Sequence, residues 1–409
     1  MRDVVITGLG VVSSIGNDAA SCVESLRDSR SGLGRDPEMQ GLGYKCQVSG
    51  RVGDLDMKSI PKQVRHATSP VGKYAVLATI QALSHAGIAP EELHLDARAG
   101  AIVGSSFSGA EQWFRAEELL EKHRNPTRLG ATGVIKAMHF SLAGNLATWL
   151  KLNGRSYALC SSFATGIDAI GHASELVARG ELDLCICGAA EQHAARQFCI
   201  FAENWGGMPT AWNDRPEGSC RPYDRDRSGT VFSEGAGILV IESADRARDR
   251  GAAPIAEIVG YGSANDGHDM FRPSGDGLRA AVGQAVAAAK ENSVDSFDYV
   301  NPHGTGTKVH DALEVEVIKE SLPGQEPMVT SFKGLAGHAM AAAGAVEMCW
   351  TLLQMRERFV APAANLDNVA PECEGVDHVR ELRETAIGTA LCFNVGLGGT
   401  NACLALRSA

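Results

Sequence analysis

The sequence predicts an α/β protein in which helices pack on mostly parallel sheets. Short apolar segments of strand length alternate with amphipathic helical patterns along the whole chain, and this alternation is typical of sheets covered by helices. The chain has 409 residues, 44% of them hydrophobic, and 46 glycines. This composition suits a large layered core with many tight turns.

The individual elements follow from apolar runs and their periodicity. Two segments have helical periodicity, 72–87 and 164–180, and in the second of these the apolar side chains recur every three or four residues. Apolar runs short enough to be strands occupy residues 4–7, 99–105, 182–188, 235–243, 299–304, 328–332 and 390–396.

The chain divides into two predicted halves, residues 1–250 and 251–409. No Pro- or Ser-rich linker separates them, and the charged-then-apolar segment 244–257 is the best candidate for the join. Each half carries one glycine-rich segment that opens a helix, SSFATGIDAIG at 161–171 and GLAGHAMAAAGAVE at 334–347. This similarity indicates an internal duplication.

Charge and hydropathy exclude several classes of protein. A net charge of −11 argues against a general nucleic-acid-binding protein, which needs a broad basic face. No stretch of about 18 purely apolar residues occurs, so no membrane span is expected. The apolar N-terminus is broken by Thr7, Gly8 and Gly10 and reads as a strand and turn rather than a signal peptide. We expect a cytoplasmic protein.

The eleven cysteines are scattered and lie mostly in apolar runs such as LDLCICGAA. We interpret them as buried reduced thiols rather than a disulfide framework. Cys185 and Cys187 have no second Cys or His pair nearby at zinc spacing, so no metal site is expected.

Several motifs place polar side chains where apolar elements end. In NPHGTGT, His303 follows a strand, where ligands bind in α/β sheets; a surface loop His is the alternative. In TSFKGLAGHAMAAAGAVE, Lys333 and His338 lie at the mouth of a helix, 339–355, that must be buried; a solvated helix cap is the alternative. The segment 392–406 is a hairpin rather than a phosphate loop, and the charges of 221–242 form a structural ion-pair network.

Taken in order, these motifs resemble the β-ketoacyl-acyl-carrier-protein synthases, and the first half and GYGSANDGHDMFRPSGDG are most similar to bacterial ketosynthase I. The resemblance covers essentially the whole chain. It implies a thiolase fold, with duplicated halves in an αβαβα five-layer arrangement. It rests on the segments VVITGLGVVSSIGN, IVGSSFSG, RPYDRDRSGTVFSEGAG, AEIVGYGSANDGHDM, NPHGTGT, KGLAGHAMAAAGAVE and NVGLGGTN.

The resemblance assigns roles to residues that match the family's motifs. In the family a Cys takes an acyl group from a carrier protein, and two His residues support decarboxylation of a malonyl thioester. His303 and His338 match those two positions, and paired imidazole donors can stabilise an enolate oxygen. The remaining matches are Lys333, which supports the second His; Glu314, a buried acid; Thr305 and Thr307, which contact the pantetheine arm; and the oxyanion-hole amides of residues 163 and 397.

The sequence departs from the family at the nucleophile. Alignment without gaps places Phe163 where the family has Cys, and Phe offers no group for a helix N-terminus to activate. Cys160 is expected to be buried in the incoming strand, and Ser161 and Ser162 to be turn or cap residues. Two pocket positions also differ, because Phe107 occupies an acyl-pocket position and Leu397 replaces the Phe of GFGGTN.

Three hypotheses fit a ketosynthase without its nucleophile. The favoured one is a chain-length-factor-type subunit whose Phe163 and Phe107 fill an acyl tunnel or shape that of an active partner. The second is a malonyl-carrier-protein decarboxylase that uses His303 and His338. The third is a condensing enzyme whose original Cys at position 163 was replaced by Phe163 for a laboratory purpose. A binding module outside this family is a fourth class, which the ordered motifs disfavour.

The resemblance implies an acyl carrier protein as partner, no metal and no redox cofactor; the carrier's 4'-phosphopantetheine serves as the substrate arm. It also implies a dimer through the central sheets, with a heterodimer favoured and a homodimer possible. Local cations can dock an acidic carrier despite the negative net charge; solvated surface charge is the alternative. The positions that match carrier-facing bases are Lys62, Arg65, Arg124 and Arg128.

Overall fold

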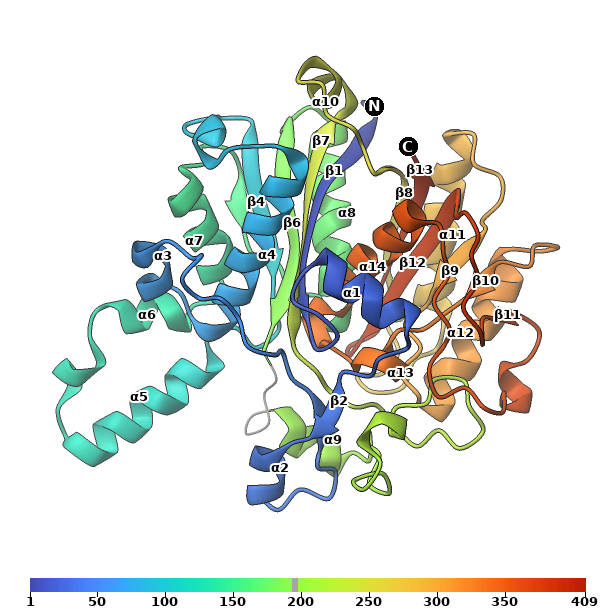
Figure 1. Ribbon diagram of the computed structural model, residues 1–409, viewed down its shortest axis with the longest axis horizontal. Coiled ribbons are helices and arrows are strands. Elements are labelled where there is room, and N and C mark those ends of the chain that lie inside the picture. Colours follow the sequence, from blue (N-terminus) through green and yellow to red (C-terminus); the bar gives the residue numbers. More distant parts are fainter. Residues whose placement is uncertain (193–197) are drawn as a thin grey trace.

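The protein is described by a computed structural model covering residues 1–192 and 198–409. Five layers are stacked side by side, helices alternating with sheet (Figure 1). The layers confirm the five-layer thiolase fold that the resemblance implies. The strands of the N-terminal half run, from the outer edge inward, in the order β5 (Ser156–Tyr157), β4 (Ala99–Gly104), β6 (Leu184–Glu191), β7 (Gly235–Ser243) and β1 (Val4–Ser13).

The C-terminal half continues the same sheet. Its strands run outward in the order β8 (Ala256–Asn265), β13 (Thr400–Ser408), β12 (Thr389–Gly396), β9 (Tyr299–Asn301), β10 (Met328–Val329) and β11 (Asp377–His378). The two halves meet where β1 pairs with β8 over only two residues, Val5 opposite Glu257 and Ile6 opposite Ala256. This short pairing lets the two halves of the sheet diverge around a central layer of helices.

Neighbouring strands in this sheet are parallel in five pairs and antiparallel in five. The expectation of mostly parallel sheets was therefore wrong. The antiparallel pairs lie where the halves join and where β12 turns back into β13 through the glycine-rich residues 397–399. That turn confirms the hairpin predicted for NVGLGGTN.

Three helical layers bury three apolar cores. The central layer consists of α8 (Thr165–Ala178) and α14 (Ala343–Glu357). These two helices approach closely, since a Cβ on Gly166 would lie 2.4 Å from the backbone nitrogen of Ala345. The outer layers consist of α4 (Pro70–Ala86) and α7 (Ser141–Leu150) on one side, and α11 (Asp276–Glu291) and α12 (Lys308–Ser321) on the other.

The helix ends follow local sequence signals. The Ser69 hydroxyl accepts a hydrogen bond from the Gly72 amide at the start of α4, where Pro70 suits the first turn. The same helix ends at Gly87, which adopts a left-handed conformation (φ 67°). The helix predicted over 72–87 is thereby confirmed, as is the helix predicted over 164–180.

The remaining elements decorate the five layers. Helices α5 (Ala110–His123) and α6 (Thr132–Ala137) project from the body at the lower left of Figure 1, and α5 has no buried residue. The others are α1 (Ala19–Arg27), α2 (Pro37–Gly41), α3 (Lys62–Ala67), α9 (Ile200–Asn204), α10 (Ala244–Asp249), α13 (Lys333–Ala336) and the small hairpin β2 (Leu33–Arg35) and β3 (Val48–Gly50).

Candidate functional site

The turn that carries Phe163 lies at the N-terminal end of central helix α8. The chain leaves edge strand β5 at Tyr157 and enters a single 3₁₀ turn, Ser162–Ala164, before α8 begins. Ser162 has a positive φ of 56°, which is uncommon for a non-glycine residue. The Thr165 hydroxyl holds the turn by donating to the Ser162 carbonyl (2.6 Å).

This turn also contacts the β12–β13 hairpin of the other half. The Leu397 amide donates to the Ser162 hydroxyl at 3.0 Å, and the Thr400 hydroxyl donates to the Ser161 carbonyl at 2.8 Å. Neither serine side chain caps the helix, and both residues belong to the turn before α8, which is the turn role expected for them. The hydrogen bond from Leu397 to Ser162 joins two residues 235 positions apart and had no sequence signal.

Phe163 packs into an apolar cluster with the two other departing residues. Its side chain is 8% exposed, and its ring lies edge-on to Phe198, with centroids 6.0 Å apart. Phe107 stacks on the same Phe198 at 5.1 Å, and Leu397 is a half-buried member of the cluster. The structure therefore brings together the three apolar residues singled out in the sequence, and adds Phe198.

The two histidines lie beside this ring. His303 follows strand β9 by two residues, and His338 lies between α13 and α14. Their ring centroids are 4.9 Å apart, and the Phe163 ring is 4.6 Å from that of His338. Both histidines are buried, so the surface-loop and solvated-cap alternatives do not hold.

Hydrogen bonds fix the tautomers of both histidines. The Asn394 side-chain amide donates to His303 Nδ1 (2.8 Å), and the Met340 amide donates to His338 Nδ1 (3.0 Å). Burial and the Lys333 charge hold the pKa of both imidazoles well below the usual range. Each neutral ring therefore carries its proton on Nε2, and His338 Nε2 is buried with no hydrogen-bond partner among the described residues.

Lys333 belongs to a buried polar chain that leads to His303. Its ammonium pairs with Glu347 at 2.5 Å, and the Asn394 amide donates to the other Glu347 oxygen at 3.1 Å. Burial raises the pKa of Glu347, although Lys333 and Asn394 oppose the shift. Sequence reasoning missed Glu347 and Asn394. Asn394 lies between two apolar residues in β12, and Glu347 is the first charged residue of α14 after an apolar start, and these signals could have found them.

Glu314 and Asp311, at the start of α12, hold the loop after His303. Glu314 accepts from the Gly304 amide (2.7 Å) and the Tyr223 hydroxyl (3.0 Å), and Asp311 accepts from the Thr305 amide (3.1 Å). Burial raises the pKa of Glu314 to about 8 and that of Asp311 to about 6. Glu314 touches the backbone beside His303 rather than its ring, so it is a positioning residue.

Thr305 and Thr307, the predicted pantetheine contacts, lie on this loop. Their hydroxyl groups are 2.9 Å apart, and the Thr307 hydroxyl also contacts His310 Nδ1 at 3.1 Å. Thr305 is buried and Thr307 half-buried. Asp311 and His310 were not predicted.

Cys160 contradicts its sequence expectation. Ten of the eleven thiols are buried as predicted, but Cys160 is exposed. Strand β5 pairs with β4 over only two residues and ends at Tyr157, so Cys160 lies in the irregular segment that follows rather than in a strand.

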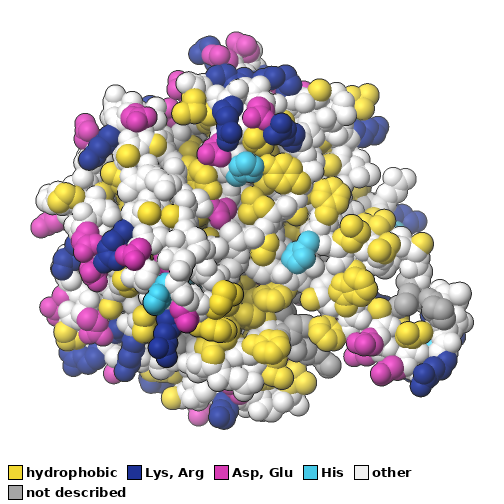
Figure 2. Space-filling model, turned by 180° about the vertical axis from the view of Figure 1, so that it is seen from behind, with side chains coloured by type: hydrophobic (Ala, Val, Ile, Leu, Met, Phe, Trp, Pro, Cys, Tyr) yellow, Lys and Arg dark blue, Asp and Glu magenta, His cyan; other side chains and the backbone are white. Residues whose placement is uncertain are grey.

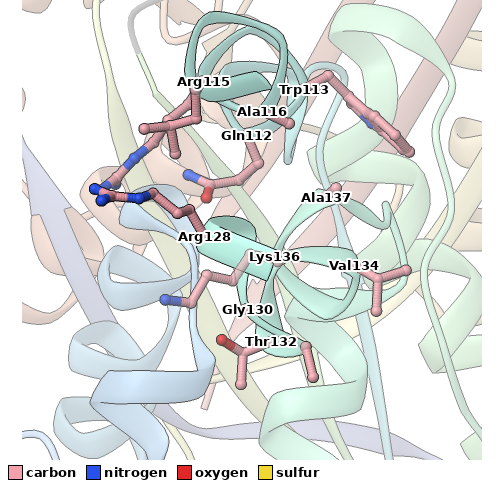
Figure 3. A pocket seen from close by; sticks show the side chains of 13 residues that line it. Gln112, Trp113, Arg115, Ala116, Arg128, Gly130, Thr132, Val134, Lys136 and Ala137 are labelled. Atoms are coloured by element: carbon pink, nitrogen blue, oxygen red, sulfur yellow. The ribbon is translucent and has the colours of Figure 1, made fainter. Parts of the chain in front are cut away.

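The four predicted docking cations lie on the surface around α5 and α6. Lys62 and Arg65 are on α3, which packs against α6. Arg128 lines one wall of a hollow of about 660 Å³ between α5 and α6, with Arg115 and Lys136, while Trp113 and Val134 lie across from them (Figure 3). Arg124 caps the C-terminal end of α5, outside this hollow. None of the four cations has an acidic partner within the described ranges.

Within residues 1–192 and 198–409, no three His, Cys, Asp or Glu side chains are arranged to hold a metal ion. No helix in the described part of the chain is long and apolar enough to span a membrane.

Comparisons with known proteins find matching family models over most of the chain. The family "Beta-ketoacyl synthase, N-terminal domain" matches residues 1–247, and "Beta-ketoacyl synthase, C-terminal domain" matches residues 255–367. The 3-oxoacyl-[acyl-carrier-protein] synthase 1 of Escherichia coli strain K12 is 36% identical over 412 residues, spanning 100% of this chain and 99% of the relative.

Two solved structures are also similar over the whole chain. The ishigamide ketosynthase/chain length factor is 27% identical, with a TM-score of 0.90 and coverage of 100% of this chain and 99% of that chain. The other is AntDE:AntF, a type II PKS acyl-carrier protein in complex with its ketosynthase. The matching chain of that structure is 25% identical, with a TM-score of 0.88 and full coverage of both chains.

Proposed function

The chain belongs to the β-ketoacyl synthase family, and we propose that it is a member without the nucleophile, serving as a chain-length-factor-type partner of an active β-ketoacyl synthase. It acts in the cytoplasm, in a type II fatty acid or polyketide system, on acyl chains carried by an acyl carrier protein. The two halves meet near residue 250. Ketosynthases need no cofactor of their own, and the phosphopantetheine arm belongs to the carrier protein.

The observation that carries this proposal is the Phe163 ring at the nucleophile turn. It fills the space beside His338, with centroids 4.6 Å apart, and is sealed by Phe198, Phe107 and Leu397. A phenyl ring has no atom that can take an acyl group. The apolar cluster at this turn therefore suits a chain that limits or shapes an acyl tunnel rather than one that takes up an acyl group covalently.

The surface supports a partner chain. Helices α5 and α6 and the residues after them expose large apolar side chains, from Trp113 at 62% to Phe140 at 45%. Hydrophobic side chains also gather across the face of the molecule seen in Figure 2. Exposed apolar side chains that gather on one surface are typical of protein–protein interfaces. We propose a heterodimer with a Cys-bearing ketosynthase.

The test is co-expression of this chain with candidate Cys-bearing ketosynthases. We expect a stable 1:1 complex by native mass spectrometry and no acyl intermediate on this chain. Replacing Phe163 with Ala in the complex should lengthen the product chains, because the space that the ring fills becomes available. A chain that remains alone with every candidate, or that carries a covalent acyl group, would reject the proposal.

A second candidate is decarboxylation of malonyl-carrier protein, which the histidine pair favours. Both rings carry Nε2–H donors, and His338 Nε2 has no partner in the described part of the chain. Two such donors can hold the enolate oxygen that forms as carbon dioxide leaves. Carbon dioxide release by the isolated chain, lost in His338→Ala, would favour this activity over a purely structural role.

The third alternative is a condensing enzyme whose Cys was replaced by Phe163. The departures at Phe107 and Leu397 favour natural divergence, since all three changes fall in one apolar cluster. If a Phe163→Cys chain alone condensed acyl and malonyl groups at a family-typical rate, this alternative would be preferred.

A further inference from the structure

We propose that the Ser162 hydroxyl occupies the position that an oxyanion would take at this site. It therefore blocks acyl transfer independently of the block that Phe163 imposes by lacking a nucleophile. The inference rests on the proposed function, because it takes the amides of residues 163 and 397 as the oxyanion donors. It adds a specific residue to that proposal. The central contact lies between the turn before α8 and the β12–β13 hairpin.

The Leu397 amide is the donor in question. It lies in the turn between β12 and β13 and donates to Ser162 Oγ at 3.0 Å. An amide N–H has one hydrogen to give. A thioester oxygen reaching this amide must therefore displace the serine hydroxyl.

The serine is held firmly in this position. Its carbonyl accepts from the Thr165 hydroxyl at 2.6 Å and the Ser106 hydroxyl at 3.4 Å. The hairpin also lies tightly against the turn, since a Cβ on Gly396 would lie 2.9 Å from the Ser162 Cβ. These contacts fix the Ser162 backbone, so the hydroxyl can leave the Leu397 amide only by rotation about the Cα–Cβ bond, which breaks its hydrogen bond.

The backbone conformation of Ser162 bears on the role of its hydroxyl. Ser162 adopts φ 56°, a region that glycine adopts without strain. A serine there carries conformational strain, and its side chain makes one described hydrogen bond, with Leu397. The neighbouring hydroxyl of Ser161 is buried without a partner among the described residues, so it serves as a matched control.

The experiment restores a nucleophile and then removes the hydroxyl. Phe163→Cys chains with Ser162, Ser162→Ala, Ser162→Gly or Ser161→Ala, all in a Cys160→Ser background because Cys160 is an exposed thiol, are incubated with S-hexanoyl-N-acetylcysteamine. The introduced thiolate attacks the thioester carbonyl carbon, and the new C–S bond replaces the bond to the N-acetylcysteamine sulfur. That leaving thiolate takes up the proton that the introduced thiol released. Intact mass spectrometry follows the acyl adduct with time.

We expect Ser162→Ala and Ser162→Gly to accelerate acylation of the F163C chain roughly ten-fold or more, because an oxyanion donor becomes free. Ser161→Ala should leave the rate unchanged. Iodoacetamide alkylates a thiol without using an oxyanion hole, so its rate should be equal in all four chains. The Gly variant keeps the test valid if the Ala variant folds poorly.

Equal acylation rates with and without the Ser162 hydroxyl would overturn the inference. So would parallel increases in acylation and alkylation, which would indicate only better access to the thiol. Neither result bears on whether the wild-type chain partners an active ketosynthase. Acylation of the wild-type chain would instead reject the proposed function.

Discussion

The two ends of the site differ in chemical character. At the His end, His303 and His338 keep neutral rings with Nε2–H donors, and Lys333 and Glu347 form a buried pair that leads to His303 through Asn394. At the turn end, a phenyl ring stands at the proposed nucleophile position and a serine hydroxyl accepts from the Leu397 amide. Under the proposed function, the groups that would act on a carboxylate remain, whereas those that would hold an acyl group are absent or occupied.

This contrast indicates that a change at the turn end need not disrupt the buried polar contacts at the His end. The polar chain at the His end is fully buried and internally paired. Removing any one member would leave a buried charge or donor without its partner. The turn end has no such constraint, because its members are mostly apolar.

Lys333→Met should have the largest effect and tests the cohesion of the His end. Glu347 would lose its cationic partner while buried, so the free energy of unfolding should fall by about 3–5 kcal/mol. Urea unfolding measures this loss. Lys333→Met combined with Glu347→Leu should recover most of it, and a loss below about 1 kcal/mol in the single variant would contradict the account.

Phe163→Ala probes the turn end. Removing the ring from a site that is 8% exposed should destabilise the fold by about 3 kcal/mol, since the surrounding cluster cannot fully collapse. Phe107→Ala serves as the comparison and should cost less, because Phe107 is half-buried. Thermal unfolding of both variants checks this order. Equal losses would show that the Phe163 ring is not part of the packed cluster.

The family resemblance of the ordered motifs predicted the five-layer fold, whereas apolar periodicity, which is a local property of the chain, predicted the central helix over 164–180. The same motifs led to His303, His338 and Lys333, which the structure brings into one buried region. Sequence reasoning failed for the strand directions, since pairing depends on where distant strands meet. It also failed for Cys160, because β5 pairs with β4 over only two residues and ends before Cys160, which an apolar run in the sequence does not reveal.

Glu314→Gln tests the support of the loop after His303. Burial raises the Glu314 pKa from its ordinary 4.5 to about 8 in the folded chain. The folded state therefore holds this proton more tightly, and the stability that Glu314 contributes falls as pH rises from about 4.5 to 8. We expect the stability difference between wild type and Glu314→Gln to change with pH in that window.

Thermal unfolding at several pH values measures this difference. The wild type should lose stability relative to Glu314→Gln as pH rises, by a few kcal/mol at most. A difference that stays constant from about pH 5 to 8 would show that Glu314 is ionised throughout. Glu326→Gln is a suitable control, because Glu326 is an acid exposed to solvent.

Charge reversal of Lys62 and Arg65 should have the smallest effect. Both residues lie outside the two ends of the site. Because these cations are predicted to face the acidic carrier, the double change should weaken carrier binding roughly three-fold or more and leave the melting temperature nearly unchanged. Lys290→Glu, on α11 in the other half, is the matched control. Surface plasmon resonance measures carrier binding, and an equal loss of affinity in the double variant and in Lys290→Glu would reject docking at α3.

Intact mass spectrometry of the wild-type chain tests the central claim most directly. The chain is incubated with excess acyl-carrier protein thioester and its mass is recorded after removal of the carrier. We predict an unchanged mass, because Phe163 offers no nucleophile and the Ser162 hydroxyl accepts from the Leu397 amide. A covalent acyl adduct mapped to this chain would contradict the account.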